Sequence, residues 1–169
     1  MNWAHLHLLM NHIPVLGTLF GLLLLIAGVI ARSISLKTAA LVVFIVAALA
    51  AIPVYLSGEP ASEMIEKVPG VVGASINQHE AAAKVALAGV EILGLMALGG
   101  LILSQRTRSL SKAVVSTVLV VGIGVTGPMA WTANLGGQIH HPEIRGAAAQ
   151  ASGGETTLPG ASPERQDDD

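Results

Sequence analysis

Six histidines are the residues of this sequence whose types and spacing could do chemistry. They are His5, His7 and His12 in "HLHLLMNHIP", His79 in "NQHEAAAK", and His140 and His141 in "GGQIHHPEIRG". A neutral imidazole is the commonest side-chain ligand of metal ions and a usual axial ligand of haem iron. Each of the three stretches adjoins a long apolar segment, so the pattern indicates a metal or haem site near a membrane boundary.

Carboxylates accompany these histidines. Glu59 and Glu63 lie in "SGEPASEMIEK", while Glu80 follows His79 directly and Glu143 lies two residues after His141. A ligating histidine normally donates its second ring N–H to a carboxylate or a carbonyl, and a carboxylate can also bind a metal directly. The candidate metal ligands are therefore His12, His79, His140, His141, Glu59 and Glu63.

The residue types that are missing exclude several functions. There is no cysteine, which rules out disulfides, thiolate metal sites, iron–sulfur clusters and covalently attached haem. The stretch "GIGVTG" (122–127) matches a dinucleotide-binding pattern, but it lies inside an apolar segment with no strand before it. No nucleophile–base arrangement and no basic stripe for nucleic acid is present. We expect no enzymatic activity from this chain alone, although it could be a subunit of an oxidoreductase.

The elements that must position these residues are membrane-spanning helices. The 169 residues are 52% hydrophobic and 12% charged, whereas a soluble domain is about 25% charged. Four apolar stretches, at about 8–31, 38–57, 82–104 and 113–135, reach the roughly 20 residues that a span requires. We predict an all-α fold: an integral membrane four-helix bundle with short loops over residues 1–145. Residues 146–169 are rich in Ala, Gly, Ser and Pro, and we expect a disordered periplasmic tail.

The loop charges predict the orientation of the bundle. The loops at 32–37 and 104–112 hold five of the nine basic residues and no acidic residue, so the positive-inside rule makes them cytoplasmic. Four spans then place both termini and the 58–79 loop outside, which is the periplasm for a bacterial inner membrane. Trp3, Tyr55 and Trp131 fall near that outer boundary, as interfacial aromatic residues do. This orientation predicts that all six histidines lie on the periplasmic side.

The histidines differ in their expected depth in the membrane. His12 is the deepest of the first three, and it begins the first span as His79 begins the third. These two spans run in the same direction, so His12 and His79 can face each other across the bundle. We expect His5 and His7 to lie at the lipid headgroups. Glycines within the spans leave room either for close helix packing or for a flat ligand, and both uses remain open.

Glu91 interrupts the third span. It lies twelve residues beyond His79, which is about 18 Å along a helix and near the middle of the membrane. A carboxyl group at that depth is costly and usually faces the bundle interior. It is either a proton carrier or cofactor partner, or a protonated side chain bonded to a threonine such as Thr18 or Thr126.

Residues 1 to about 146 resemble a group of small bacterial membrane proteins. The segments that carry the resemblance are "LLMNHIPVLGT", "SGEPASE", "HEAAAK" and "TANLGGQIHHPEIRG". The group looks related to a domain-of-unknown-function family with a four-helix, cytochrome-b-like architecture. The resemblance implies haem ligands on the first and third helices, which map to His12 and His79. It also makes His141 the more typical residue of the 140–141 pair.

Together these observations predict a membrane electron-transfer subunit. Haem b would be bound near the periplasmic face, with His12, His79, His141 and Glu91 as the candidate cofactor-binding residues. Expected partners are the lipid bilayer, a larger redox or photosynthetic complex or a second copy, and a quinol or periplasmic electron carrier. One alternative is a non-haem site for a divalent ion of copper, zinc or iron. The other is a structural subunit that carries no cofactor.

Overall fold

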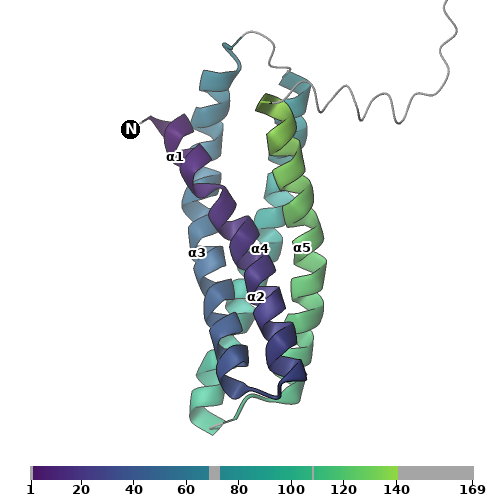
Figure 1. Ribbon diagram of the computed structural model, residues 1–169. Helices are drawn as coiled ribbons and strands as arrows, with labels where there is room; N and C mark the ends of the chain where they lie inside the picture. The colour runs from purple at the N-terminus through teal and green to yellow at the C-terminus, as the bar shows by residue number, and fades with distance from the viewer. Residues whose placement is uncertain (1, 69–72, 108, 141–169) are drawn as a thin grey trace, which may run out of the picture.

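The computed structural model describes residues 2–68, 73–107 and 109–140, and these are helical apart from short turns. The helices are α1 (Trp3–Met10), α2 (His12–Ile30), α3 (Ile34–Ile65), α4 (Gly73–Thr107) and α5 (Lys112–His140), arranged as Figure 1 shows. Helices α1 and α2 continue one another, so the chain forms a four-helix bundle and the predicted all-α fold class is confirmed. All four long helical segments have the length and apolarity to cross a membrane. The predicted tail, His141 and Glu143 lie outside the described residues.

The break between α1 and α2 has a local cause. Pro14 carries no N–H, so the carbonyl of Met10 loses the donor that it would have in an unbroken helix. The chain passes through a turn at Asn11, and α1 packs on α3 far more than on α2. The side chain of Asn2 caps the start of α1 by accepting a hydrogen bond from the backbone N–H of His5 at 2.8 Å. Residues 3–10 therefore form a separate short helix that packs against the C-terminal half of α3.

A tight turn reverses the chain between α2 and α3. Arg32 adopts a left-handed conformation with φ of 52°, as the residue after a helix often does. The N–H of Ser33 donates to the carbonyl of Gly28 at 3.0 Å, and that of Arg32 to Val29 at 3.2 Å. The side chain of Ser33 then caps α3 by accepting from the N–H of Leu36. The two helices are therefore antiparallel neighbours along most of their length.

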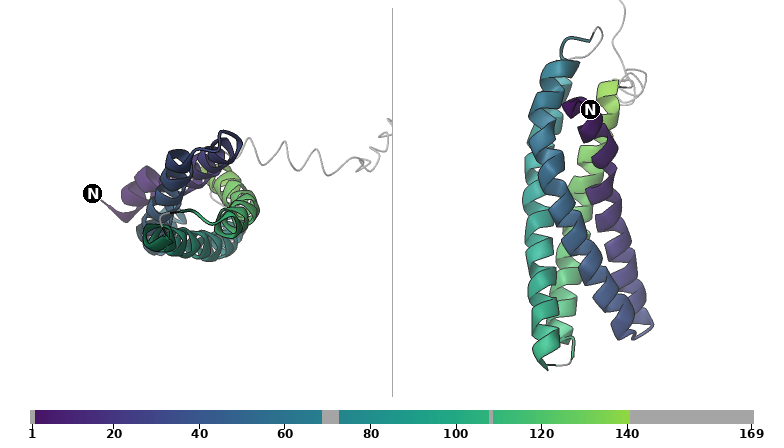
Figure 2. Two further views of the ribbon diagram at one scale, coloured as in Figure 1. Left: turned by 90° about the horizontal axis from the view of Figure 1, so that it is seen from below. Right: turned by 90° about the vertical axis from the view of Figure 1, so that its left-hand side faces the viewer.

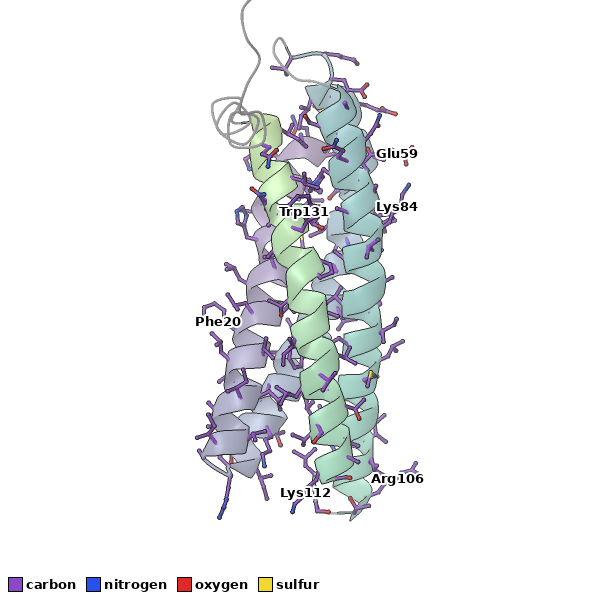
Figure 3. The ribbon with its side chains drawn as sticks, turned by 90° about the vertical axis from the view of Figure 1, so that its right-hand side faces the viewer. Phe20, Glu59, Lys84, Arg106, Lys112 and Trp131 are labelled. Atoms are coloured by element: carbon purple, nitrogen blue, oxygen red, sulfur yellow. The ribbon has the colours of Figure 1, made fainter. Side chains whose placement is uncertain are left out.

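Phe44 is the centre of the core. Its side chain is fully buried, and glycines on two other helices make room for it. A Cβ on Gly21 of α2 would lie 2.7 Å from its Cε1 atom, and one on Gly122 of α5 would lie 3.5 Å from its Cζ atom. Seen along the long axis, the helices surround this shared core (Figure 2). Phe20, in contrast, is 58% exposed and points outward from α2 (Figure 3).

The two ends of the bundle differ in charge. Arg106 and Lys112 lie at one end, and Glu59 lies near the other (Figure 3). The start of α1 and the end of α5 are both at the end opposite the α2–α3 turn (Figure 1). The arrangement agrees with an even number of crossings. Among the described residues, Arg32, Lys37, Arg106 and Lys112 lie at the end with the α2–α3 turn, whereas Lys67 and Lys84 lie toward the other end.

Close approach of α3 and α4 at Gly94 yields a stability prediction. A Cβ on Gly94 would overlap the Cβ of Ala48 on the facing helix, whereas a Cβ on Gly99, on the same helix, would meet nothing within 4 Å. We expect Gly94→Ala to lower the free energy of unfolding by about 1–3 kcal/mol, as overpacking usually does. Gly99→Ala should leave it unchanged or raise it by up to about 1 kcal/mol. Loss of helical circular dichroism during denaturation in mixed micelles measures both, and equal effects would contradict the packing argument.

Candidate functional site

Two histidines meet at the end of the bundle opposite the α2–α3 turn, and they come from helices far apart in the sequence. The ring centres of His7, on α1, and His79, on α4, are 6.5 Å apart, and the ring planes are nearly perpendicular at 88°. Both side chains are half-buried. The pair is held by groups of α3 and α5, so all four sides of the bundle contribute to this site.

The His7 ring is held by α3. Its Nδ1 atom lies 2.9 Å from the carbonyl oxygen of Val54 and 3.3 Å from Oγ of Ser57. Ser57 is fully buried, and its hydroxyl donates to the same Val54 carbonyl at 2.9 Å. Because a carbonyl oxygen can only accept, Nδ1 of His7 must carry the hydrogen. In the neutral ring Nε2 then keeps its lone pair.

The His79 ring is held by α5 in the same way. Its Nδ1–H donates to the carbonyl oxygen of Thr132 at 3.0 Å, which again leaves the Nε2 lone pair free in the neutral ring. The Thr132 hydroxyl is not involved, because it donates to the carbonyl of Pro128 at 2.8 Å. Gly136, one turn further along α5, lies against the ring: a Cβ there would be 3.1 Å from Cε1 of His79. Any other residue at position 136 would displace the His79 ring.

The pair has the features of two ligands of one metal centre. Ligating histidines usually donate the second ring nitrogen to a backbone carbonyl or carboxylate, and both rings do so here. Two imidazoles bound on opposite sides of a metal at about 2.0–2.1 Å have ring centres about 6.3 Å apart. The observed separation of 6.5 Å fits that spacing. The residues therefore suit a metal centre that takes two axial imidazoles.

The structure pairs His79 with His7 and not with His12. His12 opens α2 with an exposed side chain, whereas His7, expected at the lipid headgroups, faces the bundle. The two residues are five positions apart, so they point to different sides of a helix. The buried residues of α2 carry a signal for His7: Gly28, Gly21 and Pro14 recur every seven residues, and the next step back is His7.

The predicted metal cluster does not form among the described residues. Glu59 and Glu63 are exposed on the last turns of α3, and His12 is exposed on α2. Within residues 2–68, 73–107 and 109–140, no group of three or more His, Cys, Asp or Glu side chains is placed to hold a metal ion. His140 ends α5, and its side chain is not described; His141 lies beyond the described residues. The expected carboxylate partners of the histidines are thus replaced by backbone carbonyls.

Glu91 is separate from the histidine pair. Its Oε1 atom is buried and has no hydrogen-bond partner among the described residues. The threonines considered as partners bond within their own helices: Thr18 donates to the carbonyl of Pro14 at 2.7 Å, and Thr126 to that of Gly122 at 2.8 Å. The structure therefore supplies no threonine partner for Glu91.

An apolar groove runs beside His79 between α4 and α5. Its volume is about 580 Å³, and it is lined by Gln78, Ala81, Ala82, Val85, Gly127, Pro128, Trp131 and Leu135. Gln78 precedes His79 in the chain, and Pro128 accepts the hydroxyl of Thr132, whose carbonyl binds His79. An apolar molecule in this groove would thus lie within a helical turn of the histidine site.

Comparison of the chain with known protein families, with curated proteins and with solved structures finds no match. The class of protein is defined by the fold and the site themselves: a bundle of four helices able to cross a membrane, with paired histidines at one end. What the pair binds has to be argued from its geometry.

The contact between Gly136 and His79 gives a prediction with a neighbouring control. A Cβ on Gly137 would meet nothing within 4 Å, so Gly137→Ala should stabilise the helix by up to about 1 kcal/mol. Gly136→Ala should gain less or destabilise, because the added methyl pushes the His79 ring by a few tenths of an ångström. Denaturation in micelles gives the stabilities, and ring chemical shifts of ¹⁵N-labelled histidine report the displacement. If His79 resonances move equally in both variants, the contact does not position the ring.

Proposed function

We propose that this chain binds one haem b, with His7 and His79 as axial ligands, and transfers single electrons near the outer face of the membrane. The observation that carries the proposal is the geometry of the pair. The ring centres are 6.5 Å apart, and each Nδ1–H is bound to a backbone carbonyl. Two histidine ligands leave no open position on the iron, which favours electron transfer over oxygen chemistry.

The number of protein ligands favours haem over a bare ion. A porphyrin supplies four of the six ligands of iron, so two histidines complete the set. A bare zinc or copper ion usually takes three or four protein ligands. The described residues offer two histidines with ring centres 6.5 Å apart and no larger group. A non-haem centre is therefore the second candidate, and metal analysis separates the two.

Each residue of the site has a role in this proposal. His7 and His79 hold the haem, which supplies one-electron chemistry when bound. The carbonyls of Val54 and Thr132 accept the Nδ1–H groups, fix the tautomers and increase the electron donation of the rings. Gly136 leaves the space that the His79 ring occupies. The helices partly bury both rings, which limits solvent reorganisation during electron transfer.

We place the protein in a bacterial inner membrane, with the histidine site toward the periplasm and the basic end in the cytoplasm. The excess of basic residues at the end with Arg106 and Lys112 supports this orientation, although Lys84 lies toward the other end (Figure 3). A quinol that approaches through the groove beside His79, or a periplasmic carrier, is the proposed electron partner. Outward-facing glycines such as Gly99 and Gly124, at which a Cβ would meet nothing within 4 Å, suit close packing in a larger redox or photosynthetic complex.

A difference absorbance spectrum tests the haem proposal. Full-length protein expressed with a haem supply and purified in detergent should show the sharp α-band of haem b after dithionite reduction. His7→Ala and His79→Ala should each lose the band, because each removes an axial ligand. His12→Ala, which changes an exposed histidine of the adjoining helix, should keep it.

The same variants show which results would contradict the haem proposal. Loss of the band in His12→Ala but not in His7→Ala would assign the ligand to α2 and overturn the pairing proposed above. A wild-type spectrum without a haem band would overturn the haem proposal. Stoichiometric zinc, copper or iron in that protein would then identify the non-haem centre, and the absence of metal would leave a structural subunit.

The absence of cysteine makes the orientation directly testable. We expect Glu63→Cys, an exposed position at the histidine end, to react with a membrane-impermeant maleimide in intact cells. Ser111→Cys, exposed at the basic end, should react only after the membrane is permeabilised. The reverse pattern would place the histidine site on the cytoplasmic face.

A further inference from the structure

The perpendicular arrangement of the two rings has a structural cause on the α3 side of the site. We infer that Ser57 is a positioning residue that fixes the plane of His7, so that the two axial ligand planes are crossed when the cofactor is bound. This inference rests on the proposed function, but it concerns a residue that touches neither the cofactor nor the other histidine.

Ser57 is placed to hold the orientation of the ring. A single acceptor for Nδ1–H restricts rotation of an imidazole about the bond between its Cβ and Cγ atoms, and a second acceptor narrows the allowed range further. His7 has two acceptors, the Val54 carbonyl at 2.9 Å and Ser57 Oγ at 3.3 Å. The Ser57 hydroxyl hydrogen is used on the Val54 carbonyl at 2.9 Å, so its oxygen lone pairs are available to His7. The three atoms form a closed triangle that fixes the direction of the Nδ1–H bond, and thereby restricts the rotation of the ring.

Burial makes this triangle rigid. Ser57 is one of two fully buried polar residues among the described residues, and burial shields its hydrogen bonds from solvent. A buried hydroxyl that both donates and accepts a hydrogen bond keeps a fixed orientation in the core. Gly58, the next residue, would carry a Cβ 3.6 Å from Cε1 of His7, so the α3 backbone also lies along the ring.

The His79 plane is fixed by backbone alone. Thr132 contributes its carbonyl, and Gly136 lies 3.1–3.4 Å, measured from its would-be Cβ, from Cε1 and Nδ1 of the ring. No side-chain oxygen within the described residues hydrogen-bonds to His79. The angle of 88° between the rings can therefore be changed by a side-chain substitution on the Ser57 side, while the His79 side stays as it is.

Crossed axial planes have a spectroscopic signature. Each axial imidazole interacts most strongly with the iron d orbital that lies perpendicular to its own plane. Perpendicular rings therefore affect the two dπ orbitals nearly equally, and low-spin ferric haem then gives a strongly anisotropic electron paramagnetic resonance signal with one large g value. Parallel rings split those orbitals and give a rhombic signal instead.

The test is the ferric signal of the full-length protein in detergent at low temperature. We expect the large-g signal in the wild type and its loss or conversion toward a rhombic signal in Ser57→Ala. Ser57→Thr, which keeps the hydroxyl, should restore the large-g signal. Ser62→Ala is the matched control: Ser62 makes the same bond to the carbonyl three residues back, Glu59, at 2.9 Å, but is not bonded to a histidine. It should behave as the wild type.

A second readout needs no cofactor. In ¹⁵N-histidine-labelled protein without haem, the Nδ1–H of His7 should exchange with solvent several-fold faster in Ser57→Ala than in the wild type, Ser57→Thr or Ser62→Ala. Unchanged exchange together with an unchanged ferric signal in Ser57→Ala would overturn the role of Ser57.

The remaining outcomes separate the two proposals. A haem band with a rhombic wild-type signal would overturn the crossed planes and leave the haem proposal intact. A wild-type spectrum with no haem band would overturn the proposed function, and with it the crossed ligand planes. The exchange measurement would then still decide whether Ser57 positions His7.

Discussion

Helices in a lipid environment gain little by burying apolar side chains against one another, because lipid is as apolar as the helices are. Their association depends on close contact, and small residues at the contact points permit it. In this bundle Phe44 fills the space that Gly21 and Gly122 leave, and α3 approaches α4 where Gly94 meets Ala48. Those contacts set the rotation of each helix about its axis. The rotation in turn decides which side chains face inward, including the two histidines.

The histidine site uses the backbone where the sequence suggested carboxylates. Both Nδ1–H groups are received by carbonyls, those of Val54 and Thr132. A carboxylate that accompanied a histidine into the bundle would have to lose its hydration, which is costly for a charge. A helix carbonyl is already present at that depth and has a second lone pair beyond its helical bond. Glu59 and Glu63 stay exposed for the same reason.

The short helix α1 links the packing to the site. It packs mainly on α3, and none of its residues is fully buried, so its position depends on a few specific contacts. The bond between His7 and Val54 is one of them. Pro14 interrupts the hydrogen bonding that would otherwise join α1 firmly to α2. The residue that completes the histidine pair is thus carried by the element with the least apolar burial in the bundle.

The sequence by itself determined the four apolar segments, the all-α class and the excess of basic residues in two of the loops, because length, composition and loop charge are local properties. It also singled out His79, which begins a long helix. It did not determine that the partner of His79 is His7: His5, His7 and His12 precede or begin the same apolar segment, and their order says little about helix rotation. The seven-residue recurrence of Pro14, Gly21 and Gly28 held part of that information. Only the tertiary structure decided the pairing and the role of Ser57, because both depend on how glycine contacts turn α1, α3, α4 and α5 toward one another.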